Sequence, residues 1–137
     1  MLLTIKIVLK LKLKRILYFL PAIGWALLIA SLSTTSALPP IPWDFLSPDK
    51  IGHLVFYAIL TSWLWWAMAE GQWRTVQLSN GALLTAFVIA STYGIFLELV
   101  QASLPHRQFD YADMLANCVG ALLSLVGYYY YGPSKKN

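Results

Sequence analysis

The chain has 137 residues, of which 58% are hydrophobic and 12% are charged. Soluble domains are ordinarily about 45–50% apolar and about 25% charged, so this composition excludes an ordinary soluble protein and predicts an all-α membrane protein. The formal net charge is +4, but half of the ten basic residues precede the first apolar segment, which indicates a membrane-topology signal. No nucleic-acid partner is expected.

The first 15 residues alternate apolar side chains with lysines at positions 6, 10, 12 and 14. This pattern is compatible with a strand, or with a helix at the membrane surface whose lysines reach the lipid headgroups. Residues 16–36 are uncharged and long enough to cross a membrane. A cleaved signal peptide is the alternative, but this segment exceeds the roughly 7–15 apolar residues of a signal core, which favours a retained span.

Three further spans are predicted over residues 48–69, 81–104 and 112–131. Residues 37–48 hold four of the seven prolines and are expected to form an exposed connector. Small residues recur at every fourth position in the last two spans, which would let helices approach closely: Ala82, Ala86, Ala90 and Gly94 in one, Ala116, Gly120 and Ser124 in the other.

The prediction for residues 1–137 is therefore a single domain, a compact bundle of four transmembrane helices. Eight of the ten basic residues fall on one side of this topology, and only Lys50 and Arg107 fall on the other. The positive-inside rule then places both termini in the cytoplasm. The two connectors that lie next to most of the acids face outward.

Several acids and amides lie within the apolar segments rather than in the connectors, notably Glu98 and Asn117. A carboxylate at membrane depth is costly and needs a partner or a function. Asp49, His53 and Tyr57 follow at steps of four, which places them on one helix face. The predicted site gathers these and neighbouring residues at the outer ends of the last three spans: Asp49, Lys50, His53, Tyr57, Glu98, Gln101, Arg107, Asp110, Asp113 and Asn117.

Within this site, His53, Glu98 and Asp113 are the candidate catalytic groups, because they can exchange protons. The others are candidate ligand-binding residues. Arg107 is expected to pair with Asp110 or Asp113, since an unpaired charge in low dielectric is strongly disfavoured.

A metal site built from His53, Glu98 and Asp113 is the alternative, but the sequence has no HExxH motif and no paired-histidine spacing. The lone Cys118 offers neither a disulfide nor a thiolate site within one chain, and His106 is expected to be a solvated turn residue. Nucleophile-elbow, P-loop, Rossmann and EF-hand motifs are also absent from the sequence. The sequence therefore predicts no metal and no other cofactor.

The ordered polar residues resemble the VanZ-like family of small bacterial membrane proteins over about residues 20–130. The resemblance rests on Asp49-Lys50-x-x-His53-x-x-x-Tyr57, then Glu98-x-x-Gln101, Arg107, Asp110 and Asp113-x-x-x-Asn117-x-x-Gly120. Ser124 stands where a glycine would be expected. The resemblance implies a multi-pass protein of the bacterial inner membrane and a link to lowered sensitivity to the antibiotic teicoplanin. It implies no catalytic assignment, so whether the protein is an enzyme stays open.

Three functions were compared. The first is an outward-facing polar pocket that binds or modifies a cell-envelope amphiphile, such as a lipid-linked cell-wall precursor or a lipoglycopeptide, with Lys50 and Arg107 meeting its phosphate. The second is a non-catalytic scaffold in which the polar residues only lock the helices together. The third, a proton-coupled transporter, is disfavoured because the acids gather at one end of the spans. Membrane lipids are expected partners in each case, and the sequence does not fix the oligomeric state.

Overall fold

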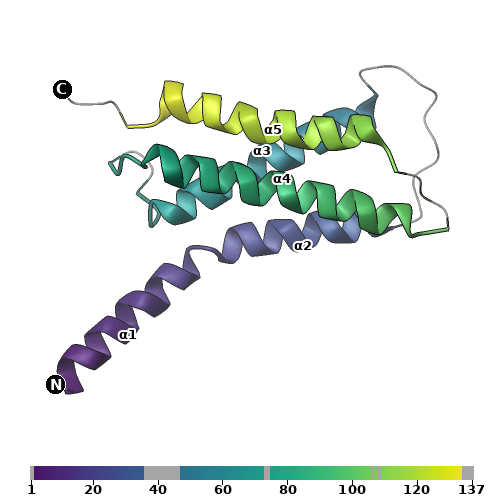
Figure 1. The fold of residues 1–137 in the computed structure, drawn as a ribbon. Helices are drawn as coiled ribbons and strands as arrows, with labels where there is room; N and C mark the ends of the chain where they lie inside the picture. The colour runs from purple at the N-terminus through teal and green to yellow at the C-terminus, as the bar shows by residue number, and fades with distance from the viewer. Residues whose placement is uncertain (1, 36–46, 73–74, 106, 108, 134–137) are drawn as a thin grey trace.

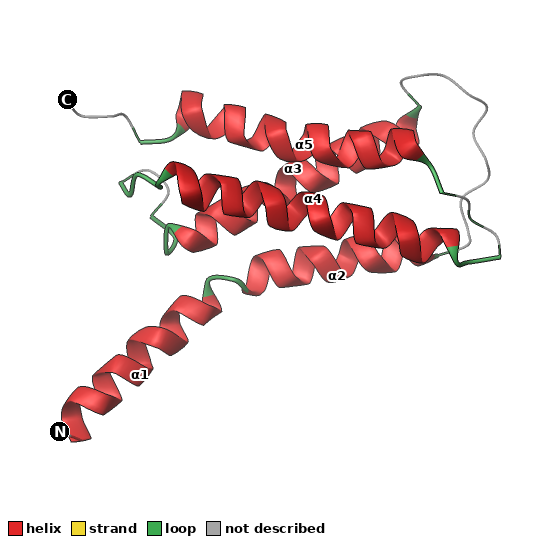
Figure 2. Ribbon diagram, viewed as in Figure 1, coloured by secondary structure: helices red, strands yellow, loops and turns green. Residues whose placement is uncertain are grey.

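The computed structural model describes residues 2–35, 47–72, 75–105, 107 and 109–133. Every regular element in this part of the chain is a helix (Figure 2), so the helical alternative for the first 15 residues is the one observed. The helices are α1 (Leu2–Leu17), α2 (Leu20–Thr34), α3 (Pro48–Met68), α4 (Asn80–Ala102) and α5 (Tyr111–Tyr131). His106 and most of the connector 37–48 lie outside the described residues.

Four segments are long and apolar enough to cross a membrane: Leu13–Thr34, Pro48–Met68, Asn80–Ala102 and Tyr111–Tyr131. Their ends lie within three residues of the predicted spans. These segments suggest a multi-pass membrane protein, as the composition predicted. The orientation of the bundle in the membrane stays a prediction.

The junction between α1 and α2 is set by Pro21. Proline has no amide hydrogen, and its ring clashes with the carbonyl four residues earlier, so a continuous helix through Leu17 is disfavoured. The chain closes a tighter turn instead, in which the Tyr18 amide donates to the Arg15 carbonyl and the Phe19 amide donates to the Ile16 carbonyl. As a result α1 projects from the bundle, while α2 lies along it (Figure 1).

Helices α3 and α5 run in the same direction, and α2 and α4 run opposite to them (Figure 1). The most extensive helix contact is between α3 and α5. It depends on Gly120, because a Cβ atom there would overlap the Leu54 carbonyl group of α3. In α4, the predicted small-residue face is buried at Ala86, Ala90 and Gly94.

Ser124 occupies the interface position where a glycine was expected. Its hydroxyl lies 2.9 Å from the Ser62 hydroxyl and accepts a hydrogen bond of 3.0 Å from the indole nitrogen of Trp65. A serine therefore keeps the α3–α5 contact close and adds hydrogen bonds across it.

Helix α2 is attached through backbone carbonyls. The Trp25 indole donates to the Phe56 carbonyl at 3.0 Å, and the Tyr93 hydroxyl donates to the Ala26 carbonyl at 2.7 Å. Near the end of α2, the Gln101 side-chain amide donates to the Ser33 carbonyl at 3.0 Å. Each bond satisfies a polar group that would otherwise face an apolar environment.

Candidate functional site

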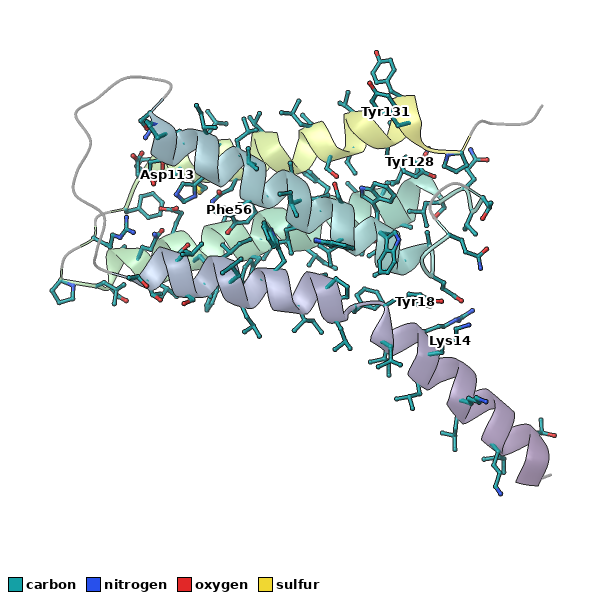
Figure 3. All side chains as sticks on the ribbon, turned by 180° about the vertical axis from the view of Figure 1, so that it is seen from behind. Lys14, Tyr18, Phe56, Asp113, Tyr128 and Tyr131 are labelled. Carbon is teal, nitrogen blue, oxygen red and sulfur yellow. The ribbon has the colours of Figure 1, made fainter. Side chains whose placement is uncertain are left out.

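The ionisable residues of the predicted site gather at one end of the bundle, where α3 and α5 begin and α4 ends. We call this the polar end. Figure 3 shows Asp113 at the polar end and Tyr128 at the opposite end of the same helix. The parallel course of α3 and α5 brings their first turns to the same level (Figure 1).

Lys50, on the first turn of α3, joins this helix to the start of α5. Its ammonium nitrogen lies 3.2 Å from Asp110 Oδ2 and 3.3 Å from Asp113 Oδ1. The pairing expected for Arg107 is therefore made by Lys50. Arg107 instead donates a long hydrogen bond of 3.4 Å to the Thr35 carbonyl, because the connector after α4 passes beside the end of α2.

Two carboxylates face one nitrogen of His53. Its Nδ1 lies 3.0 Å from the side-chain oxygen of Asn117, while its Nε2 lies 3.6 Å from Asp113 Oδ2 and 3.9 Å from Asp49 Oδ1. An amide oxygen only accepts hydrogen bonds, so Nδ1 carries a hydrogen in this arrangement. Asp113 is shared, with one oxygen toward Lys50 and the other toward His53.

A layer of buried polar side chains lies beneath these contacts. Tyr57, Glu98 and Asn117 are each only 1% exposed. Gly94 makes room for two of them, since a Cβ there would lie 3.0 Å from both Asn117 and Tyr57. Glu98 Oε1 has no hydrogen-bond partner among the described residues, and Asp113, His53 and Asp110 are ionisable groups that interact with it electrostatically.

Asp110 caps the start of α5. Its Oδ1 accepts a hydrogen bond of 2.7 Å from the Ala112 amide, and its Oδ2 pairs with Lys50. Partial burial acts to raise the pKa of Asp110, but the hydrogen bonds from the Ala112 amide and the Lys50 ammonium outweigh it, so the pKa lies below its ordinary value. Asp110 therefore holds its negative charge firmly.

The structure thus separates the predicted site residues into three groups. In direct contact at the polar end are Asp49, Lys50, His53, Asp110, Asp113 and Asn117. Tyr57 and Glu98 lie buried below them, and Gln101 and Arg107 bond to carbonyls at the end of α2. Sequence reasoning did not list Gly94 in the site, although it ends the small-residue series of α4. The contact group can hold positive charge and exchange protons.

A hollow of about 340 Å³ lies at the opposite end of the bundle. Leu78, Leu83 and the tyrosines around Tyr128 line it, and none of the described side chains that line it is acidic or basic. This hollow is therefore separate from the ionisable residues of the polar end.

Comparison with known proteins identifies relatives of the whole chain and of part of it. The model of the family described as VanZ/LLP1 matches residues 4–132. A fission yeast protein (Schizosaccharomyces pombe), named uncharacterized protein C11E3.10, is 31% identical over 87 residues, which cover 64% of this chain and 48% of that protein. The chain thus spans about half the length of this curated relative. No solved structure shows a significant match.

Proposed function

Because the chain belongs to the VanZ/LLP1 family, whose model matches residues 4–132, we propose that its polar end binds the phosphate-bearing headgroup of a membrane amphiphile and exchanges protons with it. The observation that carries this proposal is the arrangement around His53. Its Nε2 faces two carboxylates, and the buried Glu98 interacts with the same histidine electrostatically. Ionisable groups gathered at membrane depth are ordinarily functional, because their burial is unfavourable.

Arg107 is proposed to contact the phosphate. Among the described residues, its guanidinium makes one long hydrogen bond, to the Thr35 carbonyl, whereas a guanidinium has five N–H donors in a planar fork that suits phosphate. The residue lies on the connector between α4 and α5, where we expect the lipid headgroups to meet the bundle.

His53, Asp113 and Glu98 are proposed to transfer protons. Asp113 lies beside the imidazole, and Lys50 holds the second oxygen of this carboxylate in place. A histidine oriented in this way can act as a general acid or base near neutral pH. Binding of the amphiphile requires only the contacts to its headgroup. Chemical modification of the amphiphile would also require the proton-transfer groups His53, Asp113 and Glu98.

A second candidate function is favoured by a specific observation. Lys50 and His53 of α3 bond to Asp110, Asp113 and Asn117 at the start of α5, so the same contacts fasten two helices. Interhelical hydrogen bonds are a common means of assembly in membranes. A purely structural role would make the protein a scaffold, and Asp113→Asn would then reduce its accumulation in the membrane before it affects any binding.

The proposal is tested by lipid binding to the purified full-length protein in detergent. A polyprenyl phosphate is the probe, its dephosphorylated alcohol is the control ligand, and bound lipid is counted by native mass spectrometry. We expect the phosphate form to bind selectively, and Arg107→Gln to weaken binding roughly threefold to tenfold, the range of a partly exposed charge-assisted contact. Arg15→Gln, at the opposite end of the bundle, is the matched control. Equal binding of phosphate and alcohol would refute the proposal.

We further propose that the polar end faces outward from a bacterial cell membrane. The distribution of basic residues supports this orientation, while the bacterial source rests on the family resemblance alone, since a relative also occurs in fission yeast. A headgroup site on this face would encounter cell-wall precursors, the class of molecule that glycopeptides bind. Expression in a susceptible bacterium should then lower teicoplanin sensitivity, and His53→Gln should remove the effect at equal protein level.

A further inference from the structure

Asp49, His53 and Asp113 present one ligand atom each within 4.8 Å of one another. The distances from His53 Nε2, 3.6 Å to Asp113 and 3.9 Å to Asp49, are too long for hydrogen bonds. They are close to the spacing of two ligands around one cation, which is about 3.3–3.6 Å for tetrahedral bonds of about 2.0–2.2 Å. Small side-chain movements would complete such a site.

The tautomer of His53 points the same way. Asn117 accepts a hydrogen bond from Nδ1, so in a neutral His53 the lone pair of Nε2 is directed at the two carboxylates. Three acceptors that face one another repel unless positive charge lies between them. A hydrogen bond from the second nitrogen of a histidine is also what commonly orients a metal-bound imidazole.

The charges at the polar end are unbalanced. Lys50 pairs with Asp110 and Asp113, and Asp49 lies beside His53, so these described side chains together carry two net negative charges when His53 is neutral. Glu98, which interacts electrostatically with Asp113 and His53, is 1% exposed and has a carboxyl oxygen with no partner among the described residues. This buried oxygen is independent of the three ligand atoms, and it too indicates that positive charge belongs in this space.

We propose that Asp49, His53 and Asp113 bind a divalent transition-metal cation. The imidazole ligand favours zinc or a similar ion over magnesium or calcium, which prefer oxygen ligands alone. The sequence suggested His53, Glu98 and Asp113 as the alternative ligand set; in the structure, Asp49 takes the place of the buried Glu98. Three protein ligands leave a coordination position open. We assign the open coordination position to a phosphate oxygen of the amphiphile, and this assignment rests on the proposed function.

Zinc binding tests the site without any lipid. The full-length protein in detergent is titrated with Zn²⁺ against a chromophoric chelator, and we expect one ion per chain. Asp49→Asn and His53→Gln should weaken binding at least tenfold. Glu70→Gln, an acid at the opposite end of the bundle paired with Arg15, is the matched control and should bind as the wild type does. Asp49 is suited to the test because its side chain is 41% exposed, so its replacement is expected to leave the fold intact.

Two results would overturn the inference: no saturable Zn²⁺ binding, or binding that Asp49→Asn and His53→Gln leave unchanged. Repeating the lipid measurement with and without Zn²⁺ separates the two proposals. Zinc binding without selective phosphate-lipid binding would uphold the cation site and refute the proposed function. Selective lipid binding that neither needs nor responds to Zn²⁺ would uphold the function and refute the assignment of the open position to a phosphate oxygen.

Discussion

Asp110 shows how one side chain serves both the fold and the site. It caps α5 through the Ala112 amide and it pairs with Lys50 of α3. Replacing it with asparagine removes only the charge, since asparagine caps helices about as well as aspartate. Replacing it with alanine removes both contacts.

We therefore expect Asp110→Asn to be mildly destabilising at pH 7 and Asp110→Ala to lose about 1 kcal/mol more, the usual contribution of an N-cap. Thermal unfolding of the purified variants in detergent measures both. Equal stability of the two variants would show that the cap contributes nothing.

The contribution of the Asp110 charge to folding stability depends on pH in a definite direction. The pKa of Asp110 is lowered in the folded protein, so its charge contributes stability above the ordinary aspartate pKa of about 3.9. That contribution is lost as the pH falls through the lowered pKa. The stability difference between wild type and Asp110→Asn should accordingly shrink on acidification, and a difference that stays constant below pH 4 would contradict the assignment.

Unlike the paired carboxylate of Asp110, the carboxyl group of Glu98 is buried and one of its oxygens has no partner among the described residues. An amide of the same shape carries no charge, so Glu98→Gln is expected to leave accumulation and thermal stability unchanged or higher. Loss of amphiphile modification in a well-folded Glu98→Gln protein would indicate a chemical role. If the variant instead fails to accumulate, the carboxylate is a structural lock, as the scaffold interpretation requires.

At the scale of helices, the contact between α3 and α5 organises the bundle. Gly120 allows it, because a methyl group there would meet the backbone of Leu54. Gly127, two turns later on the same helix, has no atom within 4 Å of the corresponding position. The two glycines form a matched pair for testing the interface.

Gly120→Ala is expected to destabilise the protein by about 1–3 kcal/mol, the ordinary range for overpacking, and more if the helices separate. Gly127→Ala should be neutral or slightly stabilising, since alanine favours helix more than glycine does. Unfolding in detergent provides the comparison. Similar losses for both variants would mean that helix propensity, not close approach, governs this interface.

The positions of the helices could be predicted from the sequence far better than their contacts. Apolar length locates a span, and small residues locate the interfaces, as Ala86, Ala90 and Gly94 show. The choice of Lys50 over Arg107 as the partner of the aspartates depends on how each helix is rotated and where the connector runs. Hydropathy does not encode that rotation. The carbonyl of Ser33 as the partner of Gln101 was unforeseeable for the same reason.

At the scale of the whole molecule, the alternating course of the helices places the ends of α2 and α4 and the starts of α3 and α5 at one end (Figure 1). The basic residues predict that this end faces outward. Cys118 is the single cysteine, so its replacement by serine gives a background in which one new thiol reports one location.

In that background, Ser103→Cys marks the polar end and Thr75→Cys marks the opposite end, and both positions are exposed. A membrane-impermeant maleimide applied to intact cells should label Ser103→Cys and spare Thr75→Cys until the membrane is opened. The reverse labelling pattern would show that the topology is opposite to the predicted one and that the proposed site faces the cytoplasm.

The pairing of α3 with α5 also governs how the protein is made. The partners of Lys50 and His53 lie 60 to 64 residues further along the chain, on the last span. During synthesis, α3 therefore reaches the membrane well before the groups that neutralise its polar face. Until α5 arrives, these side chains must stay near water or be shielded by the insertion machinery. A chain arrested before α5 would display them without the partners that α5 and its N-cap supply, a marker by which membrane proteases can distinguish an unfinished protein from a complete one.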